Sequence, residues 1–206
     1  MKLNTAKICR LTLGLTLTGV FAAAPAQSAT LSAHSEAAKA VRRGPAAVQA
    51  ALTRAGTRRD TDLAEALLGY AETHTVRGQA APTGEVSALT AAPTFCRGRA
   101  FSRHRLSIAG VTLLTQTVFQ NGFCWRNLRV VSSEGQSVRR WAAFLYCWTN
   151  TSEGEYWTRR SVPGLPDRKR AWAQAQAGID TGLGCIPAQR DRPIVDFNGV
   201  GQLRWR

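Results

Sequence analysis

Four cysteines in the second half of the chain limit most strongly what it can fold into. The chain has five cysteines, and four of them follow residue 95: Cys96, Cys124, Cys147 and Cys185. None of these four forms the closely spaced pair that is typical of zinc sites, and an even number of thiols in an exported chain usually forms disulfides. We therefore predict two disulfide bonds and expect neither a metal site nor another cofactor.

The N-terminus has the layout of a secretory signal peptide. Three basic residues stand before or at the start of an apolar run over residues 11–24, and the small-residue motif Ala-Pro-Ala follows at 24–26. The run is shorter than the roughly 20 residues that a membrane-spanning helix needs, so we expect no membrane span in the mature form. The sequence predicts a signal peptide over residues 1–29 and a secreted, extracellular protein.

Two segments of different composition precede the cysteines. Residues 30–75 are Ala-rich, and Val48, Leu52 and Ala55 have the spacing of one helix face. A short helical segment with so few large apolar residues buries little surface alone, so it either lies on the following domain, is a removable pro-segment, or acts as a spacer. Residues 76–94 are rich in Pro, Gly and small residues, which predicts a linker, either a flexible tether or an extended loop that lies on the domain.

Residues 95–206 have the composition of a β domain, and all six tryptophans lie in this part. Residues 111–119 and 123–131 are β-branched and aromatic stretches separated by Asn121-Gly122, a dipeptide that favours a tight hairpin turn. Further strands with turn signals about every ten residues are typical of a sandwich or barrel. We therefore predict a mostly β fold, an antiparallel β-sandwich or partly open barrel, preceded by the short α-helical segment.

The expected order of strands favours one of the possible disulfide pairings. A turn centred near Gly135 between residues 123–131 and 138–149 would place Cys124 almost opposite Cys147. Cys96 and Cys185 would then form the second bond. Four cysteines allow three connectivities, so the other two stay open.

The chain is strongly basic, with a formal net charge of +14. Residues 96–206 carry 17 basic and 7 acidic residues, a net charge of +10, whereas residues 30–95 carry 7 and 6. The second half is therefore attractive to polyanions. Four arginines alternate with other residues after Cys96, so in a β-strand their side chains would share one face. These are Arg97, Arg99, Arg103 and Arg105. The alternative is that the tryptophans are core residues and the arginines are merely solvated. The polyanion-binding candidates are Arg97, Arg99, Arg103, Arg105, Arg139, Arg140, Arg159, Arg160, Arg168, Lys169 and Arg170.

Three short motifs resemble a known group of proteins. These are Phe123-Cys124-Trp125, the Trp- and Cys-bearing stretch 141–148, and the ending 193–201. In these features residues 95–206 resemble small secreted actinobacterial proteins that have a single Cys- and Trp-containing β domain. The resemblance implies a secreted β-sandwich. That group has no established activity, so the resemblance assigns no functional residues, and the helical segment departs from its single-domain members.

Catalytic motifs are scarce in this sequence. No nucleophile elbow, zinc-protease or nucleotide-binding fingerprint occurs. His104, between Arg103 and Arg105, is a candidate base for a small secreted hydrolase of nuclease type, with arginines holding the phosphate. The alternative for His104 is an exposed histidine in a basic strand or loop, which we favour.

The leading hypothesis is therefore a secreted, non-catalytic binding or structural module. Its Arg- and Trp-rich surface would contact an anionic envelope polymer or a partner protein, without specific recognition of nucleic acid. A further alternative is a protease inhibitor or toxin that presents residues 161–170, whose Pro-Gly-Leu-Pro core is rigid enough to be pre-organised.

Overall fold

The computed structural model describes residues 25–86 and 92–206. Pro45 begins the second helix, where a proline removes no helical hydrogen bond. The Asp60 carboxylate caps the third helix by accepting a hydrogen bond of 2.9 Å from the Leu63 N–H. The Ala-rich segment is thus helical, as predicted. Its helices are α1 (Pro25–Arg43), α2 (Pro45–Arg58) and α3 (Thr61–Leu68).

The predicted signal peptide, residues 1–29, lies outside the described residues except for its last residues, which belong to the start of α1. Among the described residues, no helix is long and apolar enough to cross a membrane. The signal peptide and the secretion of the protein stay predictions.

Within residues 25–86 and 92–206, eight strands form a first layer of the fold. Two four-stranded ladders, with the orders β1-β4-β5-β8 and β2-β3-β6-β7, follow each other in one register. Ala100 faces Gln120 and Arg97 faces Phe123. Both pairs are therefore three residues apart on each strand, so the antiparallel register is unchanged between the two ladders. The first layer is therefore built from four long antiparallel strands, each interrupted once. Its strands are β1 (Glu72–Gln79), β2 (Pro82–Val86), β3 (Thr94–Arg97), β4 (Ala100–Ile108), β5 (Val111–Gln120), β6 (Phe123–Arg126), β7 (Arg129–Ser133) and β8 (Gln136–Ala142).

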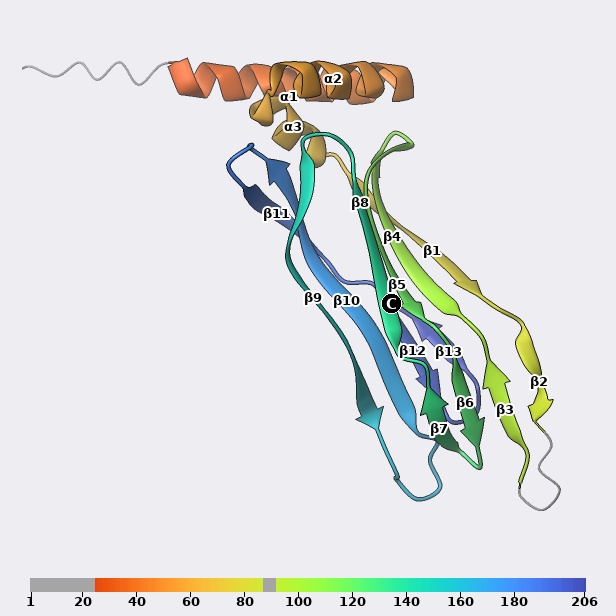
Figure 1. The fold of residues 1–206 in the computed structure, drawn as a ribbon. Helices are drawn as coiled ribbons and strands as arrows, with labels where there is room; N and C mark the ends of the chain where they lie inside the picture. The colour runs from red at the N-terminus through yellow and green to blue at the C-terminus, as the bar shows by residue number, and fades with distance from the viewer. Residues whose placement is uncertain (1–24, 87–91) are drawn as a thin grey trace, which may run out of the picture.

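Five strands form a second layer against the first. β10 pairs with β9 along one edge and with β12 and then β11 along the other, and every pairing is antiparallel. The helices lie across one end of the long strands (Figure 1). The predicted mostly β antiparallel sandwich is confirmed, and the sheets do not close into a barrel. The strands are β9 (Tyr146–Arg159), β10 (Arg168–Asp180), β11 (Cys185–Asp191), β12 (Ile194–Asn198) and β13 (Leu203–Trp205).

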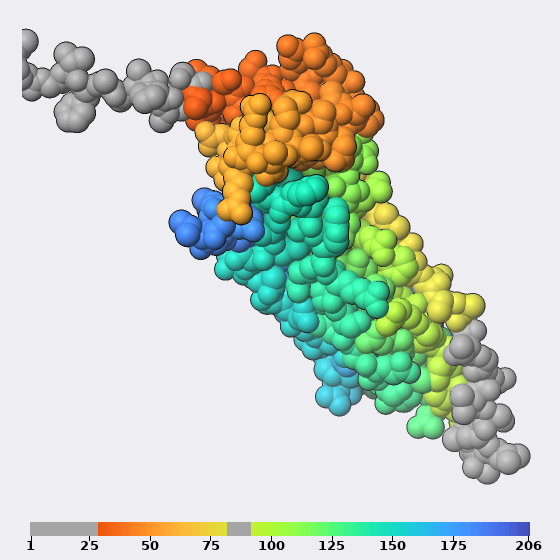
Figure 2. Space-filling model, turned by 45° about the horizontal axis from the view of Figure 1, so that its top comes forward, coloured from red at the N-terminus to blue at the C-terminus, as the bar shows by residue number. Residues whose placement is uncertain are grey.

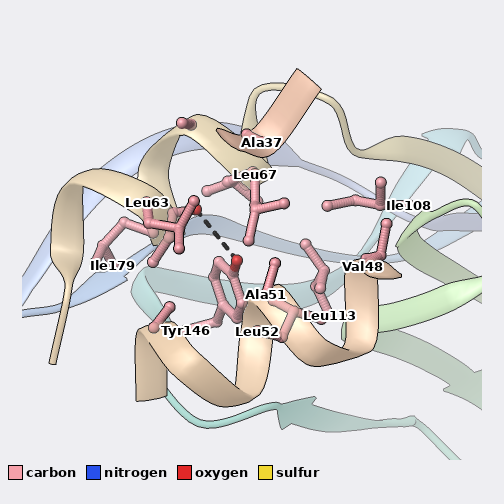
Figure 3. Packing of buried hydrophobic residues seen from close by; sticks show 14 of the residues in the cluster. Ala37, Val48, Ala51, Leu52, Leu63, Leu67, Ile108, Leu113, Tyr146 and Ile179 are labelled. Carbon is pink, nitrogen blue, oxygen red and sulfur yellow. Dashed lines mark hydrogen bonds between the residues drawn. The ribbon is translucent and has the colours of Figure 1, made fainter. Parts of the chain in front are cut away.

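The helices share a hydrophobic core with the end of the sandwich. Leu63 and Leu67 of α3 pack in one cluster with Ile108, Leu113 and Tyr146 of the strands and their turns (Figure 3). The Tyr146 hydroxyl donates a hydrogen bond of 3.1 Å to a backbone carbonyl of α3, and its burial raises the pKa of this hydroxyl above its ordinary value. The helical segment is thus packed onto the β part, as the space-filling view also shows (Figure 2).

The interior face of β10 is lined by alanines. Ala171, Ala173, Ala175 and Ala177 are fully buried and alternate with half-buried residues, which is the period of a strand with one face in the core. Such small side chains leave room between the layers for longer side chains from the first layer, including Gln116, which is also fully buried.

Both disulfides are present, but the predicted pairing is wrong. Cys96 of β3 faces Cys124 of β6 directly, and the bond joins Cα atoms 4.0 Å apart. Cys147 is bonded to Cys185, with Cα atoms 6.0 Å apart. On its other side, Cys124 faces Ser132 of β7 and not Cys147. The predicted pairing assumed that the chain reverses near Gly135, but β7 and β8 continue there in one register.

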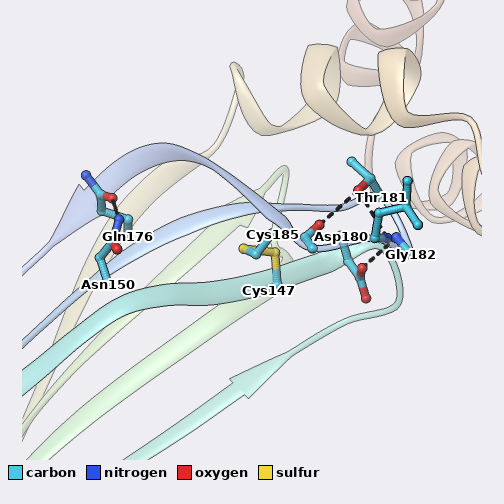
Figure 4. Close-up of a disulfide and its surroundings, with 9 residues drawn as sticks. Cys147, Asn150, Gln176, Asp180, Thr181, Gly182 and Cys185 are labelled. Carbon is cyan, nitrogen blue, oxygen red and sulfur yellow. Dashed lines mark hydrogen bonds between the residues drawn. A yellow bond between two sulfur atoms is a disulfide. The ribbon is translucent and has the colours of Figure 1, made fainter.

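The Cys147–Cys185 bond reaches over β10. Cys147 faces Gly178 across the β9–β10 ladder, and Cys185 begins β11 on the opposite edge of β10 (Figure 4). A Cβ atom on Gly178 would lie 3.0 Å from the Cys185 Sγ and 2.1 Å from the Ile186 carbonyl oxygen. Only glycine allows this approach of the bond and of β11.

The hairpin turn is at a different dipeptide from the one predicted. β5 and β6 run on through Asn121-Gly122 in the same register, so the chain does not reverse there. It reverses at Asn127 and Leu128, whose φ angles of 47° and 66° are both left-handed, as a two-residue hairpin turn requires. Asn tolerates this conformation well, but Leu128 gives no sequence signal for it.

The linker predicted over residues 76–94 is wrong for most of its described residues. Residues 76–79 belong to β1 and residues 82–86 form β2, and both pair with strands of the first layer. β1 is exposed along nearly all of its length, so its sequence has no alternation of apolar and polar residues to reveal a strand. The remaining part, residues 87–91, lies outside the described residues.

Candidate anion-binding site

Four of the predicted polyanion-binding residues gather on the outer face of the first layer. In β4, Ser102 and His104 are buried toward the second layer, so Arg103 and Arg105 point outward. Arg139 projects from the same face of β8, because the ladders align Arg103, Thr117 and Arg139 in one row. We call Arg99, Arg103, Arg105 and Arg139 the arginine face.

Two phenylalanines support the arginine face. The guanidinium carbons of Arg99 and Arg139 lie 4.7 and 5.7 Å from the centroid of the Phe119 ring. That of Arg103 lies 5.7 Å from Phe101, and the two rings are themselves in contact, with centroids 5.9 Å apart. Phe119 is buried although it is on the outer face, since the guanidinium groups cover it. Stacking on aromatic rings fixes these side chains while leaving their N–H donors free for a ligand.

No acidic side chain in the described part of the chain forms an ion pair with the arginine face. Arg103 donates to the Thr117 hydroxyl at 3.1 Å and Arg99 to the Asn121 side-chain oxygen at 3.3 Å, both neutral acceptors. The buried Nε of Arg105 has no hydrogen-bond partner among the described residues. The positive charge of this face is therefore uncompensated.

The other predicted basic residues lie elsewhere, and three of them are neutralised. Arg140 pairs with Glu153 at 3.1 Å, and Lys169 pairs with Glu155 at 2.5 Å. Arg170 pairs with Asp196 at 2.6 Å, and this hydrogen bond raises the pKa of the guanidinium above its ordinary value. These cations are compensated within the protein and are poor candidates for a ligand.

The remaining predicted residues do not join the arginine face. Arg97 turns to the Gln79 side-chain oxygen, at 2.8 Å. Arg159 donates to the Pro166 carbonyl, and Arg160 lies over the Trp157 ring, both where β9 ends. Arg168 begins β10 opposite Arg159. They are therefore separate from the four outward arginines of the first layer.

None of the six tryptophans is fully buried. Trp141, at the end of β8, is the most exposed, at 51 %. The other five are half-buried. Trp125, for example, is stacked on Phe95 and makes a tilted contact with Phe123. Only Trp141 therefore presents a large ring surface, and it lies two residues from Arg139 on the same face.

His104 is buried, so the expectation of an exposed histidine is wrong. Its Nδ1 lies 2.6 Å from the Asp191 carboxylate of β11, in the interior of the sandwich. Gln116 donates to the same carboxylate at 3.0 Å, and Arg140 donates to the Gln116 side-chain oxygen at 2.7 Å. Alternation explains the burial, because two outward arginines flank His104 in β4. The pair joins the two layers, and both of its side chains are buried.

The loop considered for an inhibitor or toxin is held down by a buried carboxylate. Asp167 accepts hydrogen bonds from the Ser161 N–H at 2.7 Å and from Arg129 at 2.9 Å. Burial would raise the pKa of Asp167, but these hydrogen bonds outweigh it and hold the pKa below its usual value. The exposed part of the loop is confined to residues 160–165.

Asp167→Asn should remove an acid-sensitive part of the stability. Because the folded-state pKa is lowered, the carboxylate stabilises the fold near neutral pH, and this contribution is lost as the pH falls from about 4 through the folded value. Urea unfolding over a pH series should show the variant less stable by about 1–3 kcal/mol at pH 7. The two proteins should converge in acid, and a constant difference at all pH values would contradict this assignment.

No metal or cofactor site was expected, and the described residues contain no group of three or more His, Cys, Asp or Glu side chains that could hold a metal ion.

No protein-family model, curated protein or solved structure matches this chain. The resemblance of residues 95–206 to the actinobacterial secreted proteins therefore stays a prediction.

The sequence alone did not reveal the partner of His104 or the phenylalanines that support the arginine face. Asp191 is 87 positions from His104, and only the pairing of the two layers brings them together. Phe101 and Phe119 could have been recognised, since Phe101 alternates with Arg103 and Arg105, but their support of the arginines depends on the β4–β5 register.

Proposed function

We propose that this protein is a secreted, non-catalytic module that binds an anionic polymer of the cell envelope through the arginine face. The observation that carries the proposal is a patch of four arginines with no acidic partner among the described residues, three of which lie over the rings of Phe101 and Phe119. Two disulfides are consistent with export to an oxidising compartment.

The geometry of the arginine face favours a repeating ligand. Arg103 and Arg105 are two residues apart, about 7 Å along the strand, and Arg139 lies two strands away from Arg103, about 10 Å across the sheet. Such spacing suits several anionic groups along one chain better than a single small anion. Guanidinium groups bind phosphate, sulfate and carboxylate with paired hydrogen bonds, which covers the anions that envelope polymers carry.

A salt series on immobilised polyphosphate and heparin tests the proposal. The wild-type protein should bind both polymers with an affinity that falls steeply with salt, because each contact releases counterions. Arg103→Gln/Arg139→Gln should lower the slope of log affinity against log salt by about 2.

The matched control removes two arginines from the second layer. Arg190 and Arg204 are exposed and form no ion pair among the described residues, so Arg190→Gln/Arg204→Gln changes the net charge equally. It should leave the affinity close to that of the wild type. Equal losses for both double variants would mean that net charge alone drives binding, and retention that ignores salt would exclude the proposal.

A further inference from the structure

An apolar pocket lies where the helices meet the sandwich. Its volume is about 330 Å³, which is within the size range of small-ligand sites. Pockets at junctions between structural units are a common place for such sites. The lining comes from α2, α3, the start of β5 and the turn between β8 and β9, and includes Leu52, Ala55, Val111, Ala142, Leu145 and Tyr146.

Two polar groups also line this pocket. The Gln49 amide and the Thr112 hydroxyl form no side-chain hydrogen bond in the described part of the chain. An apolar wall with a few free polar groups is the usual composition of a site that orients a small molecule.

Phe144 stands at the mouth of the pocket. It is 79 % exposed, and its φ of 36° is left-handed, which is rare for a bulky residue. Its ring lies against α2, where a Cβ atom on Gly56 would be 3.6 Å from it. Phe144 also lines a second hollow of about 260 Å³, which extends to Asp180. Backbone strain of this kind is found at ligand clamps, and here it holds an exposed ring that lines two hollows.

Trp141 connects the pocket to the arginine face. It lines the pocket, and it lies on the outer face of β8 two residues from Arg139, about 7 Å away. Thr115 and Arg105 continue the row of Trp141 across the first layer, with Arg105 about 10 Å from it. Apolar and cationic surfaces are thus continuous at this end of the molecule.

We propose that this pocket binds the apolar chain of an amphiphile whose anionic headgroup lies on Arg105 and Arg139. The inference rests on the proposed function, because it assigns a lipid-linked or acylated anion to the same arginine face. The charge selects the headgroup and the apolar lining selects the chain, so an uncharged amphiphile binds more weakly. The Gln49 amide and the Thr112 hydroxyl can form hydrogen bonds with the group that links the apolar chain to the headgroup.

Calorimetry with dodecanoate and with uncharged dodecyl maltoside, both below their micelle-forming concentrations, tests this proposal. The wild-type protein should bind dodecanoate at least tenfold more tightly. Ala143→Phe, which fills the pocket, and Gln49→Trp, which closes its mouth from the exposed side of α2, should each weaken dodecanoate binding at least tenfold. Ala46→Trp, an exposed control on the same helix, should not, and thermal unfolding should show that all three variants are folded.

The outcomes separate this proposal from the polymer-binding proposal. Pocket variants should leave binding to polyphosphate unchanged, whereas Arg105→Gln/Arg139→Gln should weaken both ligands. Folded pocket variants that bind dodecanoate like the wild type would overturn the pocket proposal. Dodecanoate binding that depends on the pocket but not on the arginines, together with no polymer binding, would overturn the role of the arginine face.

Discussion

Asp191→Ala should destabilise the protein by about 3–5 kcal/mol, the range expected when one partner of a buried ionic or hydrogen-bonded pair is removed. Asp191 is 5 % exposed and accepts hydrogen bonds from His104 and Gln116 of the first layer. Its loss removes the partner of the His104 Nδ1 and the shorter of the two hydrogen bonds that Gln116 donates to residue 191, leaving only the 3.4 Å contact to the backbone carbonyl. Gln116 in turn holds Arg140. Urea unfolding at pH 7 followed by circular dichroism measures the change.

The double variant His104→Leu/Asp191→Leu is the control for this prediction. It replaces both partners by apolar groups, and such replacements of buried pairs are often nearly neutral. The double variant should therefore be more stable than Asp191→Ala alone. A loss below about 1 kcal/mol in Asp191→Ala would show that this pair is not the buried link between the layers.

Removing the Cys147–Cys185 bond is expected to cost about 4 kcal/mol. The bond closes a loop of 38 residues, and restricting the unfolded chain over such a loop stabilises by about this amount. It also holds β9 and β11 together over Gly178. Cys147→Ala/Cys185→Ala should unfold at a clearly lower urea concentration than the wild-type protein.

The Cys96–Cys124 bond provides the comparison. Its loop, with a separation of 28, gives a similar entropic contribution, but its strands already pair with each other on both sides of the bond. Its removal should leave the β3–β6 ladder in place. Mass spectrometry of peptides from the non-reduced protein checks the pairing itself, and peptides linking Cys124 to Cys147 would contradict the fold described.

Most of the strands could be predicted from the sequence because one face of each is buried. The β-branched and aromatic residues of β5 indicate a strand. The alternating alanines of β10 also fit a strand, although Ala and Gln suit a helix almost equally. β1 could not be recognised, since an exposed edge strand shows no such alternation. The turn at Asn127-Leu128 was missed because Asn121-Gly122 is the stronger local signal. The disulfide pairing was wrong because a further turn was expected near Gly135, where β7 and β8 instead continue in one register.

The candidate site could be predicted only in part for a similar reason. Alternation correctly places Arg103 and Arg105 on one face, since this depends on a single strand. The addition of Arg139 and the position of Phe119 under the guanidinium groups depend on strand pairing. Likewise, the sequence gives no sign that Arg140, Lys169 and Arg170 are neutralised, because their acidic partners lie on other strands.

The most direct test of the arginine face observes its guanidinium groups as a ligand is added. Nitrogen-15 spectra of the arginine Nε–H groups, recorded while polyphosphate is titrated, should show the largest shifts at Arg99, Arg103, Arg105 and Arg139. Signals of the ion-paired Arg140 and Arg170 should change little. Shifts concentrated at Arg159, Arg160 and Arg168, or spread evenly over all arginines, would contradict a binding site on the outer face of the first layer.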